Sequence, residues 1–221
     1  MAVELPRLTG YRLAFIVGVP LGWAVLLLFH PGFDVDDIYN DLQDQVNQWL
    51  AVHVGTLFFI GLLGAALYLL VRDLVGLLAS VSRVGAGVFV LFYGAGEAIL
   101  GIAAGVVAQH ANDLPATERG GAADAIQAIW HTFLSADLFQ TIGAVGWIVG
   151  VLAAAVAFRQ VGAPLAVSIL LALSAIVILH GPPIGPIGLV FFVAAVAVLV
   201  RWQRASATPS NMATEPGHGA A

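Results

Sequence analysis

Apolar stretches long enough to cross a lipid bilayer recur along the whole of this 221-residue chain. A membrane-spanning α-helix needs ~20 predominantly apolar residues to cross ~30 Å of hydrocarbon. The stretches are continuous rather than alternating with period two, which favours helices over the strands of a β-barrel. Only 10% of the residues are charged, against about 25% in soluble domains. The sequence therefore predicts an all-α, polytopic membrane helix bundle.

The apolar stretches predict six transmembrane helices within one domain, residues 1–204. The helices are expected at about 11–29, 50–71, 84–109, 138–158, 164–180 and 186–201. The last two are short and need tight packing or a locally thinned bilayer. Residues 205–221 are small, polar and interrupted by proline. Because this composition is typical of disorder, we expect a disordered cytoplasmic tail.

The basic residues indicate which side of the membrane each connection faces. Lysine is absent, and all eight basic residues are arginines. Arg119 is expected on one side, and the other seven fall together on the opposite side: Arg7, Arg12, Arg72, Arg83, Arg159, Arg201 and Arg204. By the positive-inside rule, both termini are cytoplasmic. The composition is typical of a GC-rich prokaryote, so we expect a multi-pass protein of its plasma membrane. With no basic cluster, nucleic acid is not expected as a partner.

Two polar connections on the outer side have the periodicity of amphipathic helices. In residues 35–49 the apolar side chains recur at helical spacing, and this segment is expected to continue into the second transmembrane helix. In residues 122–134 the apolar side chains form one stripe, and Asp124, Gln127 and His131 form the opposite face. We therefore expect amphipathic outer helices before transmembrane helices two and four.

Glu97 is the only charged residue in the segment 84–109 and lies near the centre of the third predicted transmembrane helix. A carboxylate inside a membrane is costly to bury, so it is a functional hypothesis by default. No arginine lies near the middle of a predicted helix, which leaves polar groups such as Tyr93, Gln140 and Thr141 as neighbours. Two interpretations stay open: a ligand- or proton-binding site, and a structural hydrogen bond between helices.

Five of the six histidines are expected near the outer boundary, at a depth similar to that of Asp137: His30, His53, His110, His131 and His180. Neutral imidazoles together with carboxylates suit zinc, copper, nickel or iron. Two imidazoles from facing helices would also suit haem iron. No H-E-x-x-H motif is present, and each histidine comes from a different element, so only the fold can assemble a site. The alternative is that these histidines anchor helix ends at the membrane interface.

Glycines share the helix face of Glu97. Gly94, Gly101 and Gly105 lie three, four and eight positions from Glu97, and Gly101-x-x-x-Gly105 is a small-x-x-x-small pattern. Such a face lets another helix approach closely, so we expect Glu97 to point into the bundle. Pro20, near the middle of the first predicted helix, frees a backbone carbonyl that would accept a hydrogen bond there. A homodimer or another membrane protein is a further partner that this face would fit.

The order of these features resembles a known family. A Thr9-Gly10-x-Arg12 start of the first helix, a polar outer loop, an arginine before the third helix and an acid within a Gly-rich helix are similar to a group of small six-helix bacterial membrane proteins. That group is known only as a domain of unknown function. The resemblance covers roughly residues 8–200. It implies a six-helix fold and no particular activity.

Three classes of function remain. The favoured one is binding or transport of a small ligand, ion or proton by the buried carboxylate, below an outward-facing vestibule lined by His and Asp. The first alternative is a metal- or haem-binding membrane enzyme or redox protein with outer histidine ligands. The second is a structural or regulatory membrane subunit. The sequence leans against an enzyme because it has no G-x-S-x-G motif, phosphate-binding loop or Rossmann glycine pattern.

Overall fold

The computed structural model describes residues 8–34, 36–132 and 138–206. These residues form helices and short connections, with no β-strand among them, so the all-α prediction is confirmed. In chain order the helices are α1 (Gly10–Leu27), α2 (Ile38–Leu42), α3 (Val46–Val71), α4 (Leu77–Val88), η1 (Phe89–Tyr93), α5 (Gly94–Glu97), η2 (Ala98–Ala103), α6 (Ala104–Asn112), η3 (Ala116–Glu118), α7 (Gly120–His131), α8 (Thr141–Gln160), α9 (Leu165–Leu173), η5 (Ser174–Ile178) and α10 (Ile184–Ser206). The predicted tail starts inside α10, and most of it lies outside the described residues.

Within the described residues, five helices are long and apolar enough to cross a membrane: Gly10–Leu27, Val46–Val71, Leu77–Asn112, Leu138–Gln160 and Ile184–Ser206. The length and apolar character of these helices are therefore those of a membrane protein. The fifth predicted crossing corresponds to Leu165–Ile178, which is apolar but shorter. A six-crossing topology therefore depends on this short helix and stays a prediction.

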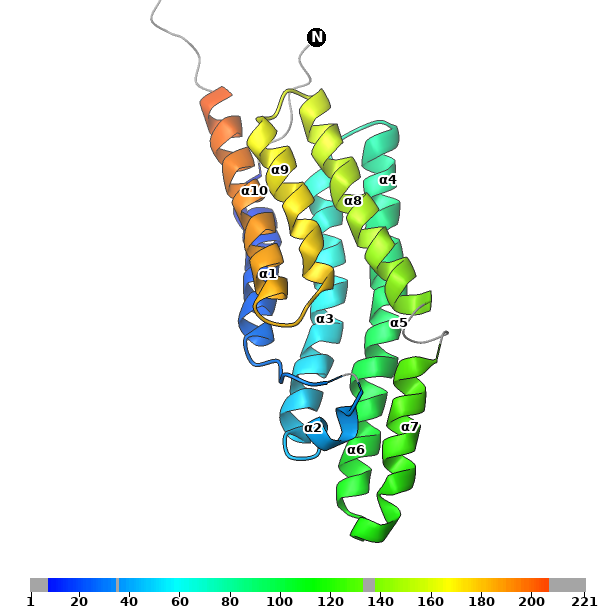
Figure 1. The fold of residues 1–221 in the computed structure, drawn as a ribbon. Helices are drawn as coiled ribbons and strands as arrows, with labels where there is room; N and C mark the ends of the chain where they lie inside the picture. Colours follow the sequence, from blue (N-terminus) through cyan, green and yellow to red (C-terminus); the bar gives the residue numbers. More distant parts are fainter. Residues whose placement is uncertain (1–7, 35, 133–137, 207–221) are drawn as a thin grey trace, which may run out of the picture.

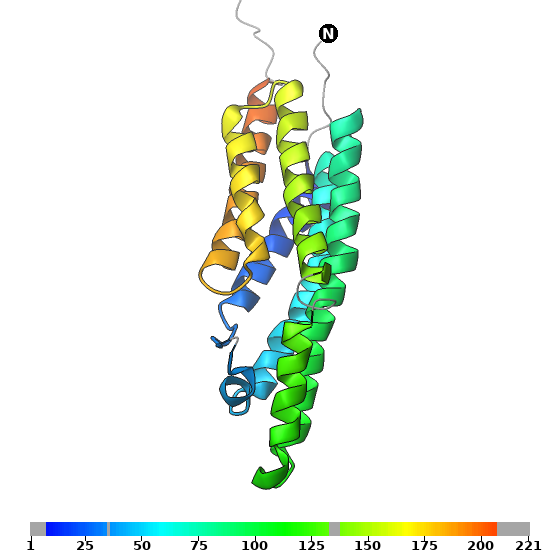
Figure 2. The same cartoon turned by 45° about the vertical axis from the view of Figure 1, so that its right-hand side comes forward.

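The third transmembrane helix is longer than the sequence indicates. It was expected at about 84–109, whereas the continuous helical run is Leu77–Asn112, 36 residues, or about 54 Å at the rise of an α-helix. Figures 1 and 2 show that this run and α3 extend past the ends of α1 and α9 at the lower end.

The outer helices pack on this extension. Helix α7 lies beside α6, as Figure 1 shows, and buries Ile126 against it. The segment 35–49 does not run continuously into the second transmembrane helix. The chain turns at residues 43–45 between α2 and α3, because α2 folds back to bury Ile38 and Leu42 in the same small cluster as Ile126.

The main core lies between α1, α3, α4, α8, α9 and α10. Its largest fully buried side chains include two tryptophans, and the indole N–H groups of both find partners there. Trp23 donates to Thr56 Oγ1 at 3.2 Å, and Trp147 donates to the Ser174 carbonyl at 3.2 Å. These bonds matter because an unpaired donor inside an apolar bundle is costly.

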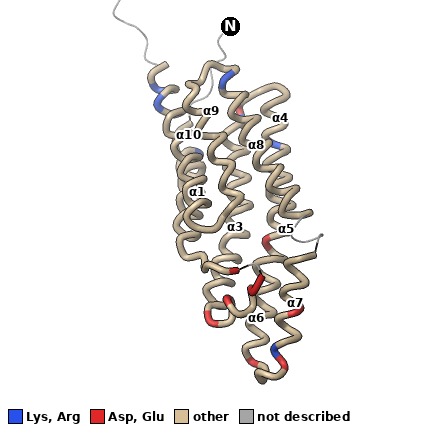
Figure 3. The backbone as a smooth tube through the Cα atoms, viewed as in Figure 1, with Lys and Arg blue, Asp and Glu red and all other residues tan. Residues whose placement is uncertain are grey.

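Charge separates the two ends of the molecule (Figure 3). The arginines of α1, α4, α8 and α10 lie towards the upper end, and acidic residues collect at the lower end around α2, α6 and α7. Arg12 pairs with Asp73 and donates to the Leu69 carbonyl, which ties α1 to the end of α3. Both ends of the described chain lie at the upper end (Figure 1).

Helices α4 and α8 approach each other through glycine. A Cβ atom at Gly85 would lie 2.6 Å from the Gly146 carbonyl oxygen and 2.9 Å from the Gly150 Cα. Only backbone surrounds that position, so no flexible side chain can move aside. Gly87, two residues along the same helix, has no atom within 4 Å of its Cβ position.

We expect Gly85→Ala to destabilise the bundle by about 1–3 kcal/mol, because the methyl group overpacks a backbone contact. Thermal unfolding of the protein in detergent measures this as a lower Tm. Gly87→Ala is the matched control and should leave Tm unchanged or raised, since alanine is the better helix former. Equal Tm values for the two variants would contradict the close approach of α4 and α8.

Candidate functional site

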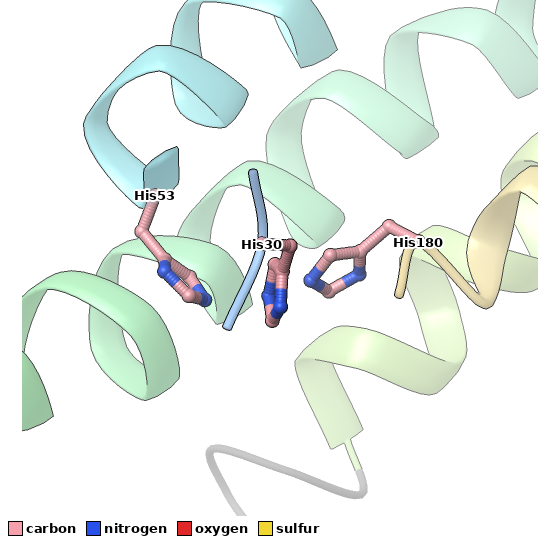
Figure 4. A group of neighbouring side chains, drawn as sticks. All are labelled: His30, His53 and His180. Carbon is pink, nitrogen blue, oxygen red and sulfur yellow. The ribbon is translucent and has the colours of Figure 1, made fainter. Parts of the chain in front are cut away.

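Three histidines meet where α1, α3 and η5 converge (Figure 4). His30 follows the end of α1, His53 lies in α3, and His180 follows η5. One ring nitrogen from each lies within 4.8 Å of the other two. The imidazole centroids are 4.9 Å apart for His30 and His53, and 5.3 Å apart for His30 and His180. Residues separated by 150 positions in the chain thus form one cluster.

Backbone carbonyls orient two of the rings. His30 Nδ1 lies 2.7 Å from its acceptor, the Pro31 carbonyl, and His53 Nδ1 lies 2.8 Å from the Trp49 carbonyl. A carbonyl oxygen only accepts, so in both rings the proton belongs on Nδ1. The Nε2 lone pair of each ring is therefore left for another partner. Metal-binding histidines in proteins are held in this way.

Tyr93 orients the third ring. Its hydroxyl donates to the Ile178 carbonyl at 2.6 Å and lies 3.0 Å from His180 Nδ1. Because the hydroxyl proton is used for Ile178, the oxygen accepts from His180 Nδ1–H. His180 therefore has the same tautomer as the other two histidines, with Nε2 free. Tyr93 acts here as a positioning residue between η1 and the segment after η5.

Glu97 lies beside the three imidazoles. Its two carboxylate oxygens lie 3.9 Å from His53 Nε2 and 3.9 Å from His180 Nε2. These distances are too long for direct hydrogen bonds. Glu97 is 1% exposed, and its Oε1 has no hydrogen-bond partner among the described residues; neither has His30 Nε2. Buried polar atoms without partners indicate a place where something else binds.

The site lies far along the bundle from the end that carries most of the described arginines. Glu97 follows Leu77 by 20 positions (77 to 97), about 30 Å along a helix, and His53 precedes Val71 by 18 positions (53 to 71), about 27 Å. Leu77 and Val71 are neighbours in the chain across one short turn. Glu97 lies near the middle of the continuous helical run Leu77–Asn112, as the sequence suggested, and its carboxylate lies beside His53 and His180 rather than at a different depth.

Two π-helical turns flank Glu97. Segment η1 ends at Tyr93 and η2 begins at Ala98. A π-helical turn shifts the helix register, so it turns side chains to directions that a regular α-helix would not give them, and such turns occur frequently at functional sites. Tyr93 and Glu97 themselves lie four positions apart, so both reach the cluster from one helix face. No residue pattern in the sequence predicts these turns.

Trp49 and Gly101 fix the position of His53. The indole stacks on the imidazole with a centroid distance of 3.9 Å, and Trp49 Nε1 donates to the Gly101 carbonyl at 2.6 Å. The ring of His53 lies directly over Gly101, where a Cβ atom would overlap it, with His53 Cγ at 2.6 Å. Gly94 and Gly105, on the same face, lie against side chains of α3. Pro20 is buried within α1.

Burial favours the neutral imidazole of His30 and of His180. Burial lowers the pKa of His30, although its bond to Pro31 opposes the shift. Burial, together with the nearby His30, lowers the pKa of His180 to about 3. A neutral imidazole offers its lone pair, whereas a protonated one cannot bind a metal ion. The cluster is therefore ready to accept a cation without first losing protons.

A cavity of about 530 Å³ opens onto the cluster. Its polar lining consists of the three histidines with Tyr93, Glu97 and Gln140, and its apolar lining includes Phe33, Leu100, Trp130, Ile178, Leu179, Pro182 and Ile184. Gln140, which the sequence suggested as a neighbour of Glu97, lies against Gly96 and lines this cavity. Largely apolar walls with a few converging polar groups are typical of small-molecule sites.

Other residues suggested by the sequence lie elsewhere. His110 is exposed near the end of α6, and His131 is exposed at the end of α7, where it contacts Gln127 at 3.0 Å. Both helices belong to the extension beyond the bundle, which takes these histidines away from the cluster. Thr141 is exposed and lines a separate groove between α4 and α8. Asp137 lies outside the described residues.

From the sequence alone, Glu97 and the histidines are two separate features, and no pattern indicates a supporting role for Trp49 or Trp130. Both tryptophans were interpretable as interfacial anchors, since tryptophan is enriched at membrane boundaries. Their role beside the cluster depends on how the outer end of α3 meets α6 and α7. One local signal was present: each of His30 and His180 precedes a proline-containing turn that ends its helix.

Comparison of this chain with protein-family models, with curated proteins and with solved structures gives no match.

We expect Gly101→Ala to weaken the binding of zinc by about 10- to 100-fold, since the added methyl group displaces the imidazole of His53. Competition with a chromophoric zinc chelator measures the dissociation constant of the purified protein in detergent. Gly94→Ala is the matched control on the same face, because its Cβ would lie 3.5 Å from Leu57 Cδ1, an ordinary contact. If both variants bind zinc as the parent protein does, His53 does not depend on Gly101.

Proposed function

We propose that this protein is a zinc-dependent membrane hydrolase whose metal ion is held by His30, His53 and His180. One observation supports this proposal most directly. All three imidazoles are held through Nδ1, which leaves their Nε2 atoms available, and the Nε2 atoms of His53 and His180 lie 3.9 Å from the two carboxylate oxygens of Glu97. Three protein ligands with a fourth position left to water are the usual arrangement of catalytic zinc.

The ligand chemistry favours zinc over the other metals considered. Imidazole nitrogen suits zinc, copper, nickel and iron, and no cysteine is present to select a softer ion. Nitrogen ligands of tetrahedral zinc lie about 2.0–2.1 Å from the ion. The histidine nitrogens, within 4.8 Å of one another, would need to move inward by roughly an ångström to reach that geometry. Small rotations of the three rings provide this movement.

The packing of the rings disfavours haem. Two axial imidazoles bind haem iron from opposite faces of a flat macrocycle, so the space between them has to stay open. In this cluster the three ring centroids form a triangle with sides of 4.9, 5.3 and 6.2 Å, so the His30 ring lies directly beside the gap between His53 and His180. His30 thus occupies the space that a porphyrin would need.

Glu97 supplies the second part of the proposed chemistry. Zinc lowers the pKa of a bound water to about 7, and a carboxylate beside that water accepts its proton. Glu97 has an unpartnered oxygen and lies 3.9 Å from the Nε2 atoms of His53 and His180. It is therefore suited to be the general base, with the histidines as ligands. In this reading, the acid and the histidines form one site.

The core beneath the cluster favours a reaction centre over a transport path. Phe89, Trp147 and Phe192 are fully buried on the inner side of the site, with ring centroids 5.0 and 6.0 Å apart. This packed aromatic layer separates the cavity from the inner end of the bundle. Ion or proton transport, the function favoured by the sequence, would require the layer to open.

The glycine-rich face gives little support to a purely structural or regulatory subunit. Gly94, Gly101 and Gly105 lie against Leu57, His53 and Leu50 of the same chain. Because α3 already covers this face, it is not free to bind another membrane protein. The close approach supports the histidine cluster within one protomer.

The proposed topology has six crossings and cytoplasmic termini in a prokaryotic plasma membrane. The described arginines lie mostly at the end opposite the cluster, in agreement with the positive-inside rule. The cavity then faces the outside. The short helix Leu165–Ile178 forms the sixth crossing.

We expect the purified protein to contain about one zinc ion per chain, because three fixed imidazoles supply the three protein ligands of a catalytic zinc ion. Elemental analysis of protein prepared in mild detergent, without chelators or a metal-binding tag, measures the content. His53→Ala and His180→Ala should each lose most of the metal. His110→Ala and His131→Ala are matched controls, since these exposed histidines lie outside the cluster, and they should keep it.

Two results would overturn the proposal. The first is a protein that neither contains zinc as purified nor binds it on addition. The second is loss of metal in the His110→Ala or His131→Ala variant with retention in the His53→Ala variant. A Soret absorption band in place of zinc would favour the haem reading, against the ring packing described above.

A further inference from the structure

The walls of the cavity indicate what kind of substrate would reach the cluster. Away from the histidines, Tyr93, Glu97 and Gln140, the lining consists mainly of apolar side chains contributed by η2, α7 and the segment around His180. Ile184 and Leu179 are both exposed beside the opening. A volume of about 530 Å³ holds far more than water and a metal ion. The excess space is apolar, so it fits a hydrocarbon group.

The depth of the cavity in the membrane also indicates a substrate with a hydrocarbon group. The cluster lies about 27–30 Å from the inner ends of α3 and α4, which is the thickness of the hydrocarbon core. At this boundary an amphipathic molecule already lies with its chain in lipid and its polar group at the level of the cluster. A lipid-like substrate would therefore meet the site without leaving the membrane.

The charges around the cavity argue against an anionic head group. No arginine is among the described lining residues, and the chain has no lysine. On this side of the molecule Arg119 donates to the carbonyls of Leu114 and Asn112, near the tip of the α6–α7 extension. Phosphate recognition in proteins relies on arginine, lysine or helix N-termini. The polar group of the substrate is thus expected to be neutral.

Two hydrogen-bonding side chains are available for such a neutral group. Trp130 lines the cavity, and its buried indole N–H has no hydrogen-bond partner among the residues that the structure describes. Gln140 lines the cavity from the α8 side and offers both a donor and an acceptor. A carbonyl oxygen that gains negative charge during hydrolysis is stabilised by donors of this kind.

We infer that the substrate is a neutral amphiphile in which a long acyl chain is joined to its head group by a carboxylic ester or amide bond. This inference rests on the proposed function, since it names the substrate class of the same site. The apolar cavity would hold the acyl chain, and the carbonyl would lie between the cluster and Glu97. The absence of a cation in the described lining sets this class apart from phosphate esters.

The reaction is a simple hydrolysis. Water bound at the cluster loses a proton to Glu97, and its oxygen forms a bond to the acyl carbon. The bond from that carbon to the head-group oxygen or nitrogen then breaks, and the leaving group takes the proton from Glu97. One water is consumed, and a fatty acid and an alcohol or amine are released. No electron is transferred, so no further co-reactant is needed.

The test uses zinc-loaded protein in mild detergent and fluorogenic probes of defined structure. The probes are the palmitoyl and acetyl esters of 4-methylumbelliferone, the palmitoyl and acetyl amides of 7-amino-4-methylcoumarin, and the phosphodiester bis(4-nitrophenyl) phosphate. We expect kcat/KM to be at least about tenfold higher for one palmitoyl probe than for its acetyl counterpart, because burial of a few methylene groups suffices for this ratio. The phosphodiester should not be hydrolysed.

Three variants locate the activity. Ile184→Trp should lower kcat/KM for the palmitoyl probe by about tenfold, since it fills the opening of the cavity, without loss of zinc. Ile187→Trp is its matched control: it lies in the same helix with the same exposed fraction, 43%, outside the cavity lining, and should be silent. Glu97→Gln should keep zinc and lose at least about 100-fold in kcat.

The outcomes separate the two proposals. Zinc binding without hydrolysis of either palmitoyl probe, or with faster hydrolysis of acetyl probes or of the phosphodiester, overturns the substrate class and leaves the metal site standing. Equal effects of Ile184→Trp and Ile187→Trp also overturn it, because the cavity would then not hold the chain. A protein that fails to bind zinc overturns the proposed function itself.

Discussion

The arrangement around the histidine cluster depends on one constraint: polar atoms buried in an apolar bundle have to find partners. A buried donor or acceptor left unpaired costs about 1–3 kcal/mol, and water cannot enter the packed core to satisfy it. The three imidazoles meet this constraint on one side, through the Pro31 and Trp49 carbonyls and the Tyr93 hydroxyl. Their other sides converge with Glu97 on a shared position, and that position is where the chemistry is expected.

Small residues make the convergence possible. His53 lies over Gly101, and any side chain there would occupy the volume of the imidazole. Farther inward, Gly85 allows α4 and α8 to touch through their backbones. Close contact of this kind replaces the hydrophobic effect, which does not drive helix association in lipid. Gly85 thus supports the packing of the bundle, and Gly101 leaves room for the His53 side chain.

The third helix shows that a hydropathy pattern can identify a helix correctly and still misplace its ends. Hydropathy marks residues 84–109 because they are apolar, whereas the helix runs over Leu77–Asn112. Which of its residues lie in the middle of the membrane depends on the position of the turn before Leu77. In the folded chain Glu97 lies near the middle of this run and at the level of the histidines. Its nearest partners there are His53 and His180.

Residue types and periodicity by themselves determined that the chain is helical, where most of its long apolar helices lie, and that Glu97 and the outer histidines are unusual for their surroundings. These features are local, because solvation and helix propensity act on short segments. Only the tertiary structure decided that His30, His53 and His180 meet while His110 and His131 do not. It also brought Glu97 to the same cluster. Such selection depends on helix ends, π-helical turns and contacts between residues far apart in the chain, which no short pattern in the sequence contains.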